Sequence, residues 1–273
     1  MTRHALVASL AAFATINTAT AQDRSDLRWR DECHDRSEWR STVRYCEVRV
    51  ERLGAIGTNG QLAVDGGENG SVEVAGSEGD SIIVHERIET QAASEGEAEA
   101  LAHEVRIISA GNSIRAEGPS SWHRRNWTVS YRITVPRHVN LQLSAVNGPL
   151  TVESVTGRLS LRAVNGPIEL DDVAGDVRAR AQNGPLDVRL SGPRWDGVGL
   201  DAETENGPVD LSLPAQYAAH LETSTVNGPM EIDFPITVQG LIDPRRLTMD
   251  IGGGGPPVRA VTTNGPVHVS RKG

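Results

Sequence analysis

Short stretches of alternating apolar and polar residues recur along the second half of the chain. The segment 150–152 reads Leu-Thr-Val, and the segment 168–170 reads Ile-Glu-Leu. A period of two is typical of a β-strand that buries one face. Six such stretches follow the tripeptide Asn-Gly-Pro, whose Asn and Gly residues are Asn147 and Gly148, Asn165 and Gly166, Asn183 and Gly184, Asn206 and Gly207, Asn227 and Gly228, and Asn264 and Gly265.

The spacing of the tripeptide predicts a stack of similar units. Successive markers lie 18, 18, 23, 21 and 37 residues apart, and a period near twenty residues is typical of repeat architectures. If the turns stack, their Asn side chains can form a hydrogen-bonded ladder with the ordinary strand spacing of about 4.8 Å. Six independent hairpins are the alternative. The common phase and the proline, which fits a strand only at its start or edge, favour stacked rungs.

Each Gly of the tripeptide is predicted to form a left-handed corner, because Asn and Gly adopt that conformation more easily than other residues. On this interpretation, Gly166→Val would cost roughly 1–2 kcal/mol or more. The measurement is the thermal midpoint of the variant.

The longest interval, before Asn264, can be divided into 18 and 19 residues, with a missing marker near Asp243. The sequence leaves open whether the stretch 231–263 is a rung or a loop. The last strand, 267–269, is expected to be an exposed edge available for docking.

Similar turns and strands are present earlier in the chain, without proline. Asn-Gly pairs precede strand-like segments at 61–64 and 71–74. In the segment 94–105, Ser94 and Glu97 fit a capping box, and apolar residues share one face, which predicts a helix. We expect this helix to cap an open end of the core, since repeat stacks need protected termini.

These segments resemble a bacterial β-strand-repeat family of unknown function described as putative adhesins. The resemblance is carried by the segment 62–74, the following helix, the segment 127–136 and the serial Asn-Gly-Pro strands, over about residues 50–270. It implies a fold similar to the head regions of auto-transporter adhesins: an all-β, single-stranded right-handed parallel β-helix (β-solenoid) with one short helix as cap or insertion. It offers no catalytic residues.

The first residues look like a secretory signal. Residues 1–21 have a weak basic head, a short apolar run and the small-residue cleavage site Ala19-Thr20-Ala21. The run is too short to span a bilayer. We therefore expect a signal peptide at 1–21, an N-terminal segment at 22–52 and a β-solenoid domain at 53–273. The protein would be exported, to the periplasm, the cell surface or the medium, with no transmembrane segment after signal removal.

Charge and cysteine content refine this picture. The net charge of −9 makes the chain a poor nucleic-acid binder, because phosphate contacts need a basic surface. Cys33 and Cys46 are the only cysteines, so a disulfide is expected in an exported chain. A zinc site beside His34 is the alternative, but the sequence has no second Cys pair, so we predict neither metal nor cofactor.

The loop between residues 118 and 126 holds the candidate binding residues Trp122, Arg124 and Arg125, and Trp127 follows it. Aromatic and arginine side chains together are typical of recognition surfaces. The other interpretation is a surface hairpin with one or two tryptophans folded onto the sheet. We favour the hairpin interpretation.

Three functions fit the sequence. The first is a non-catalytic, adhesin-like protein of the cell envelope that binds a glycan, another polymer or an envelope protein. The second is a polysaccharide-active lyase or hydrolase, for which stacking would align Glu169, Asp187 and Asp210 into one column of carboxylates. The third is a regulator of envelope stress. Because the carboxylates alternate with apolar residues as on any solvated strand face, we predict the first function and no enzyme.

Overall fold

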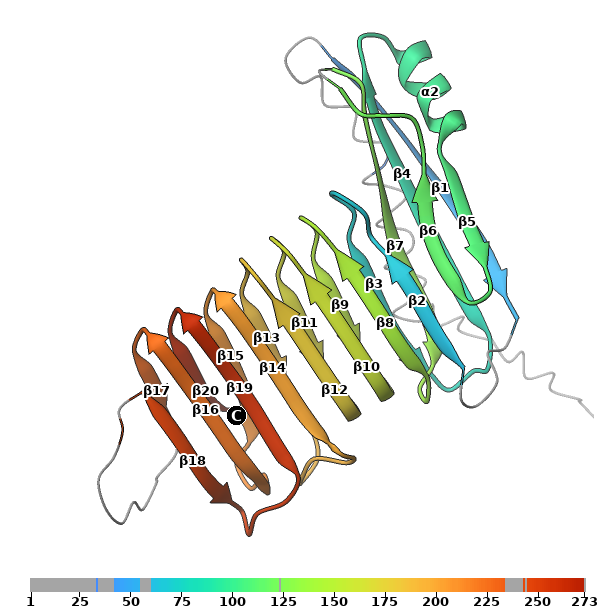
Figure 1. Cartoon of the computed structure of the whole chain (residues 1–273). Coiled ribbons are helices and arrows are strands. Elements are labelled where there is room, and N and C mark those ends of the chain that lie inside the picture. Colours follow the sequence, from blue (N-terminus) through green and yellow to red (C-terminus); the bar gives the residue numbers. More distant parts are fainter. Residues whose placement is uncertain are drawn as a thin grey trace, which may run out of the picture.

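The computed structural model describes residue 33 and the ranges 42–54, 60–122, 124–233, 243 and 245–272. Within these residues the fold is all-β, as predicted, with strands in two ten-stranded sheets (Figure 1). The structure thus shows two facing sheets where the sequence predicted one continuous single-stranded coil. The leader at 1–21, and residues 22–41 except Cys33, lie outside the described residues.

The first sheet contains ten strands in a spatial order that differs from chain order. That order is β1 (Val43–Leu53), β4 (Ile82–Ala92), β7 (Asn126–Pro136), β3 (Val72–Ser77), β9 (Leu150–Glu153), β11 (Ile168–Asp171), β13 (Leu186–Arg189), β15 (Val209–Pro214), β20 (Val267–Lys272) and β17 (Met230–Ile232). The pairs from β7 to β17 are parallel, and β1, β4 and β7 pair antiparallel.

The second sheet supplies the other half of each rung. Its order is β18 (Arg246–Ile251), β16 (Ala219–Asn227), β19 (Pro257–Asn264), β14 (Gly199–Asn206), β12 (Ala174–Ala181), β10 (Thr156–Ala163), β8 (Asn140–Ala145), β2 (Gln61–Asp65), β6 (Ser113–Glu117) and β5 (Arg106–Ala110). Only the outermost pairs, β16 with β18 and β5 with β6, are antiparallel.

The core lies between the two sheets. The apolar residues of the inner Asn-Gly-Pro strands, such as Ile168 and Leu170 in β11, are fully buried, and Leu159 and Leu161 of β10 are buried in the other sheet. Those of the edge strand β17 are only partly buried. Residues between them point to solvent, so each sheet has one buried and one polar face. This arrangement explains the period of two in the sequence.

The excursion between β3 and β8 builds one end of the stack. The helix α2 (Glu95–Glu104) begins after Ser94, whose Oγ accepts a hydrogen bond from the Glu97 N–H, as the capping box predicted. It buries Ala98, Leu101 and Ala102 and packs against β1 and β4 (Figure 1). The helix therefore covers apolar surface at the end formed by β1, β4 and β7.

The C-terminal rung, β19 and β20, lies inside the stack. β19 pairs with β14 on one side and β16 on the other, and β20 lies between β15 and β17. The prediction of a missing marker near Asp243 is therefore wrong: residues 246–251 form the antiparallel strand β18, and the rung at 257–272 occupies the place expected for the rung at 219–232. The predicted docking edge at 267–269 is also wrong, because β20 is paired on both sides.

The asparagines of the six tripeptides, preceded by Asn69, lie in one hydrogen-bonded column. Each Nδ2 donates to the Oδ1 of the asparagine on the adjacent rung. The distances are 3.0 Å for Asn147 to Asn69, 2.8 Å for Asn165 to Asn147, 2.9 Å for Asn183 to Asn165, 2.8 Å for Asn206 to Asn183, 2.7 Å for Asn264 to Asn206 and 2.8 Å for Asn227 to Asn264. The ladder follows spatial order, since Asn264 lies between Asn206 and Asn227.

The glycines of the tripeptide are needed for close approach. None of the six has a positive φ, so the predicted left-handed corner is wrong. A Cβ atom on Gly166 would instead lie 2.0 Å from the carbonyl oxygen of Gly148, and a Cβ on Gly184 would lie 2.3 Å from that of Gly166. These contacts are with backbone, which cannot move without separating the rungs.

We predict that Gly166→Ala destabilises the protein by about 1–3 kcal/mol, the usual cost of overpacking. Gly96→Ala is the control, because Gly96 lies in α2 without a positive φ, and a Cβ added to it would meet no atom within 4 Å. Thermal or denaturant unfolding measures both. Equal stability of Gly166→Ala and wild type would contradict the packing of the corners.

Candidate functional site

The loop that the sequence singled out forms a small hairpin. Trp122 and Arg125 exchange two backbone hydrogen bonds of 3.0 Å, and Arg124 lies at the exposed turn between them. Trp122 is 66% exposed. Arg125 is less available for a ligand, because its Nη2 lies 2.7 Å from Oε1 of Glu104 in α2.

Trp127, in contrast, packs against the protein. Its Nε1 donates a hydrogen bond of 2.7 Å to the carbonyl oxygen of Pro119, and its ring lies over Gly118, where a Cβ would approach within 2.7 Å. The ring also contacts the buried core. The structure thus brings Trp122, Arg124 and Arg125 together on one hairpin and turns Trp127 inward.

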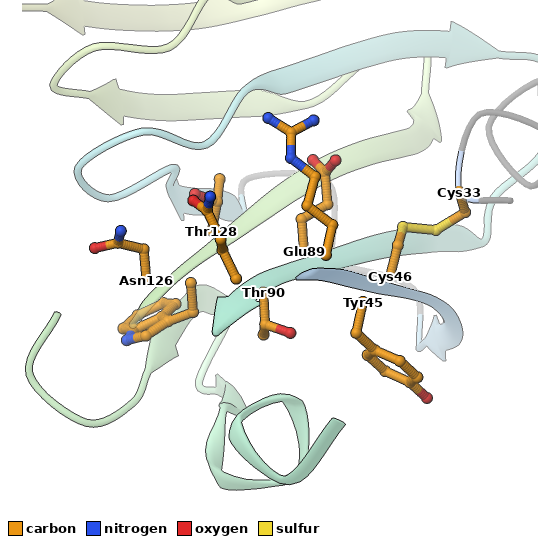
Figure 2. A pocket seen from close by; sticks show the side chains of 10 residues that line it. Cys33, Tyr45, Cys46, Glu89, Thr90, Asn126 and Thr128 are labelled. Atoms are coloured by element: carbon orange, nitrogen blue, oxygen red, sulfur yellow. A yellow bond between two sulfur atoms is a disulfide. The ribbon is translucent and has the colours of Figure 1, made fainter. Parts of the chain in front are cut away.

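A hollow of about 210 Å³ lies beside the disulfide between Cys33 and Cys46, whose Cα atoms are 5.2 Å apart. The disulfide confirms the predicted pairing. Figure 2 shows the hollow with Tyr45 and Thr90 in its lining. Ligand pockets usually measure about 300–1,000 Å³, so this hollow is smaller than most of them. A more open hollow of about 470 Å³ is lined by Glu104, Arg106 and Glu117.

The outer face of the first sheet is acidic. Glu169 pairs in register with Asp187, and Asp187 with Asp210, so the predicted column of carboxylates is confirmed. The column continues to Glu73 through Thr151. Each strand contributes one member on the open side of the sheet, at the strand separation of about 4.8 Å.

Asp187, the middle carboxylate of this column, has a raised pKa. Burial raises the pKa of Asp187, and the charges of Asp210 and Asp171 raise it further, whereas Arg189 acts against the shift. Arg189 Nη2 lies 2.8 Å from Asp187 Oδ2. Asp187 therefore forms an ion pair on the solvent-facing side of the sheet, as expected for a surface carboxylate.

The outer face of the second sheet carries an ion-pair network. Arg259 Nη1 lies 2.6 Å from Asp201 Oδ1 and 3.0 Å from Glu203 Oε2, and Arg180 also binds Asp201. Burial alone would raise the pKa of Asp201, but hydrogen bonds from Arg180 and Arg259 lower it. This network ties three adjacent strands, β12, β14 and β19, together across the face.

One buried carboxyl group was missed by the sequence reasoning. Glu86 is 3% exposed on the core face of β4, beside Arg49 of β1 and Tyr131 of β7, and its Oε1 has no hydrogen-bond partner among the described residues. Burial and the charge of Glu51 raise its pKa to about 7, against the effect of Arg49. The alternation along the strand could have revealed it, because Glu86 falls at a buried position in the same series as Ile82 and Val84.

Two negative findings apply to the described part of the chain. In the ranges given above, no three His, Cys, Asp or Glu side chains gather closely enough to hold a metal ion. No helix within the same ranges combines the length and apolar character needed to cross a membrane.

Comparison with known proteins gives distant structural similarities. No family model and no curated protein matches the chain. A putative cell adhesion protein from Clostridium sporogenes ATCC 15579 is 14% identical with a TM-score of 0.44, covering 83% of this chain and 100% of that one. A putative adhesin from Bacteroides fragilis NCTC 9343 is 11% identical (TM-score 0.36; 83% and 97% covered), and a putative lipid binding protein from Parabacteroides distasonis ATCC 8503 is 10% identical (0.35; 84% and 97%). These similarities are too distant to carry a function to this chain.

We predict that the stability of the protein falls as the pH rises from about 4.5 through 7. The folded-state pKa of Glu86 lies above the ordinary value of 4.5, so the native state holds a proton that the unfolded state releases. The stabilisation by the Glu86 proton is fully present below pH 4.5 and is lost as the pH rises through about 7. A shift of this size corresponds to about 3 kcal/mol.

Glu86→Gln should therefore unfold at a higher temperature than wild type at pH 8, with a smaller difference at pH 5. Thermal unfolding across this range measures the effect. Glu89→Gln is the control, since Glu89 lies on the outer face of the same strand beside Arg87. Identical pH dependence in wild type and Glu86→Gln would show that Glu86 is not the responsible group.

Proposed function

We propose that this chain is a non-catalytic, adhesin-like β-solenoid of the cell envelope, which binds an extended polymer or an envelope protein along the outer face of a sheet. The observation that carries the proposal is the in-register stacking of the rungs. Because each rung repeats the last, every outward position becomes a straight column of similar spacing. A repeating ligand can contact such a face over many units at once, which raises avidity without a deep pocket.

The disulfide supports a location outside the cytosol. Structural disulfides persist in the periplasm, at cell surfaces and in secreted proteins, and Cys46 of β1 is joined to Cys33. We therefore propose export after removal of the leader at 1–21. The division into a segment at 22–52 and a repeat domain at 53–273 also stays a prediction. The strand β1, which spans this boundary, joins the first sheet by pairing with β4.

A length series of glycans tests this function. The full chain is titrated with oligomers and polymers of the same envelope polysaccharide, and with envelope proteins, while the ligand size is measured before and after incubation. We expect the affinity for a bound glycan to rise with its length and its size to stay constant. Shortening of the polymer would show the enzyme alternative, and failure to bind any polymer or envelope protein would refute the proposal.

A further inference from the structure

The outer face of β10 and β12 is basic, although the chain as a whole has a net charge of −9. These two strands are neighbours in the second sheet (Figure 1). Their outward charged residues are Arg158, Arg162, Arg178, Arg180 and Asp176. We call this set the arginine face. It lies on the opposite side of the stack from the acidic column of Glu169 and Asp187.

About half of the positive charge on the arginine face is uncompensated. Asp176 is shared between Arg158, at 3.9 Å, and Arg178, at 3.6 Å. The side chains of these two arginines are 75% and 66% exposed. Arg162 is exposed and forms no ion pair with a carboxylate of the described residues. Only Arg180 is fully neutralised, by Asp201 and Glu203.

Arg162 has an arginine, and not a carboxylate, as its neighbour on the adjacent strand. Arg162 lies directly opposite Arg180 in the register of β10 and β12, and Ser160 lies opposite Arg178. Like charges directly opposite one another on neighbouring strands are destabilising. Because Asp201 and Glu203 neutralise Arg180, this repulsion is small, and the charge of Arg162 stays available to an anionic ligand.

The strand beside the arginine face is neutral and rich in hydrogen-bonding groups. The outward residues of β8 are Asn140, Gln142 and Ser144, with Gln142 in register with Ser160. Gln142 Oε1 accepts a hydrogen bond of 2.7 Å from Gln61. Amide and hydroxyl side chains of this kind can both donate to and accept from the hydroxyl groups of a sugar.

We propose that the arginine face, together with β8, binds a polysaccharide that carries carboxylate groups; this inference rests on the proposed function. Guanidinium groups bind carboxylates in a bidentate geometry. Arg162 and Arg178 therefore bind the carboxylates of the polysaccharide, and the polar side chains of β8 form hydrogen bonds with its hydroxyl groups. Asp201 and Glu203 border the basic strip, so a polymer as densely charged as DNA, with one charge per about 1.7 Å, is disfavoured.

The test compares binding of polygalacturonate and of its fully methyl-esterified, neutral form to the full chain at low and at physiological salt. We expect polygalacturonate to bind and to weaken with salt, because the contacts are ionic. Arg162→Gln with Arg178→Gln should weaken binding by about tenfold or more, since two of the repeated charge contacts are lost. The same variant should unfold at about the same temperature as wild type, because both side chains are exposed and Arg178 forms only a surface ion pair.

Arg245→Gln with Arg246→Gln is the matched control, because it removes the same charge from exposed positions at β18. It should leave polygalacturonate binding within about twofold of wild type. Equal loss in both variants, or tighter binding of duplex DNA or of phosphatidylglycerol vesicles, would overturn the inference. If the neutral ester binds as tightly as polygalacturonate, the carboxylate inference is wrong, but the proposed binding of polymers still stands. If no polymer or envelope protein binds, both proposals are refuted.

Discussion

The stack depends on the close approach of its glycine corners. At each corner the carbonyl oxygen of one glycine occupies the space where a Cβ of the next would lie, as Gly148 does for Gly166. This contact brings successive rungs to hydrogen-bonding distance, so that Asn165 can donate to Asn147 beside it. A single side chain at a corner would separate two rungs and break both the ladder and the strand pairing next to it.

Fixed rung spacing also determines the chemistry of the surface. Once the corners are aligned, the residues between the buried positions form columns, and their character depends only on what each rung places there. One face consequently collects Glu169, Asp187 and Asp210, whereas the other collects arginines from β10 and β12. Opposite charges on the two faces allow an acidic protein to present a basic surface for an anionic polymer.

Local features and the stacking of the regular units were predictable from the sequence, whereas the spatial order of the last rungs was not. The alternation around Ile168 and the cap at Ser94 are encoded by neighbouring residues, so strands and helix agree with prediction. Asn-Gly permits several backbone conformations, which explains the wrong left-handed corner. The rung at 257–272 has the same pattern as the others, so nothing local specifies its neighbours. The arginine face could have been predicted in the same way as the carboxylate column, because Arg162 and Arg180 are 18 residues apart and pair in register, as Glu169 and Asp187 do.

Cross-linking of engineered cysteines tests the stacking of the rungs most directly. In the structure Ser212 and Ser270 are paired in register, with their Oγ atoms 3.1 Å apart, a geometry that a disulfide can bridge. Ser212→Cys with Ser270→Cys should therefore form a disulfide on mild oxidation, detectable by mass spectrometry of the digested protein. A second variant, Ser212→Cys with Asp233→Cys, tests stacking in chain order. A disulfide in this variant, with none in Ser212→Cys with Ser270→Cys, would contradict the account.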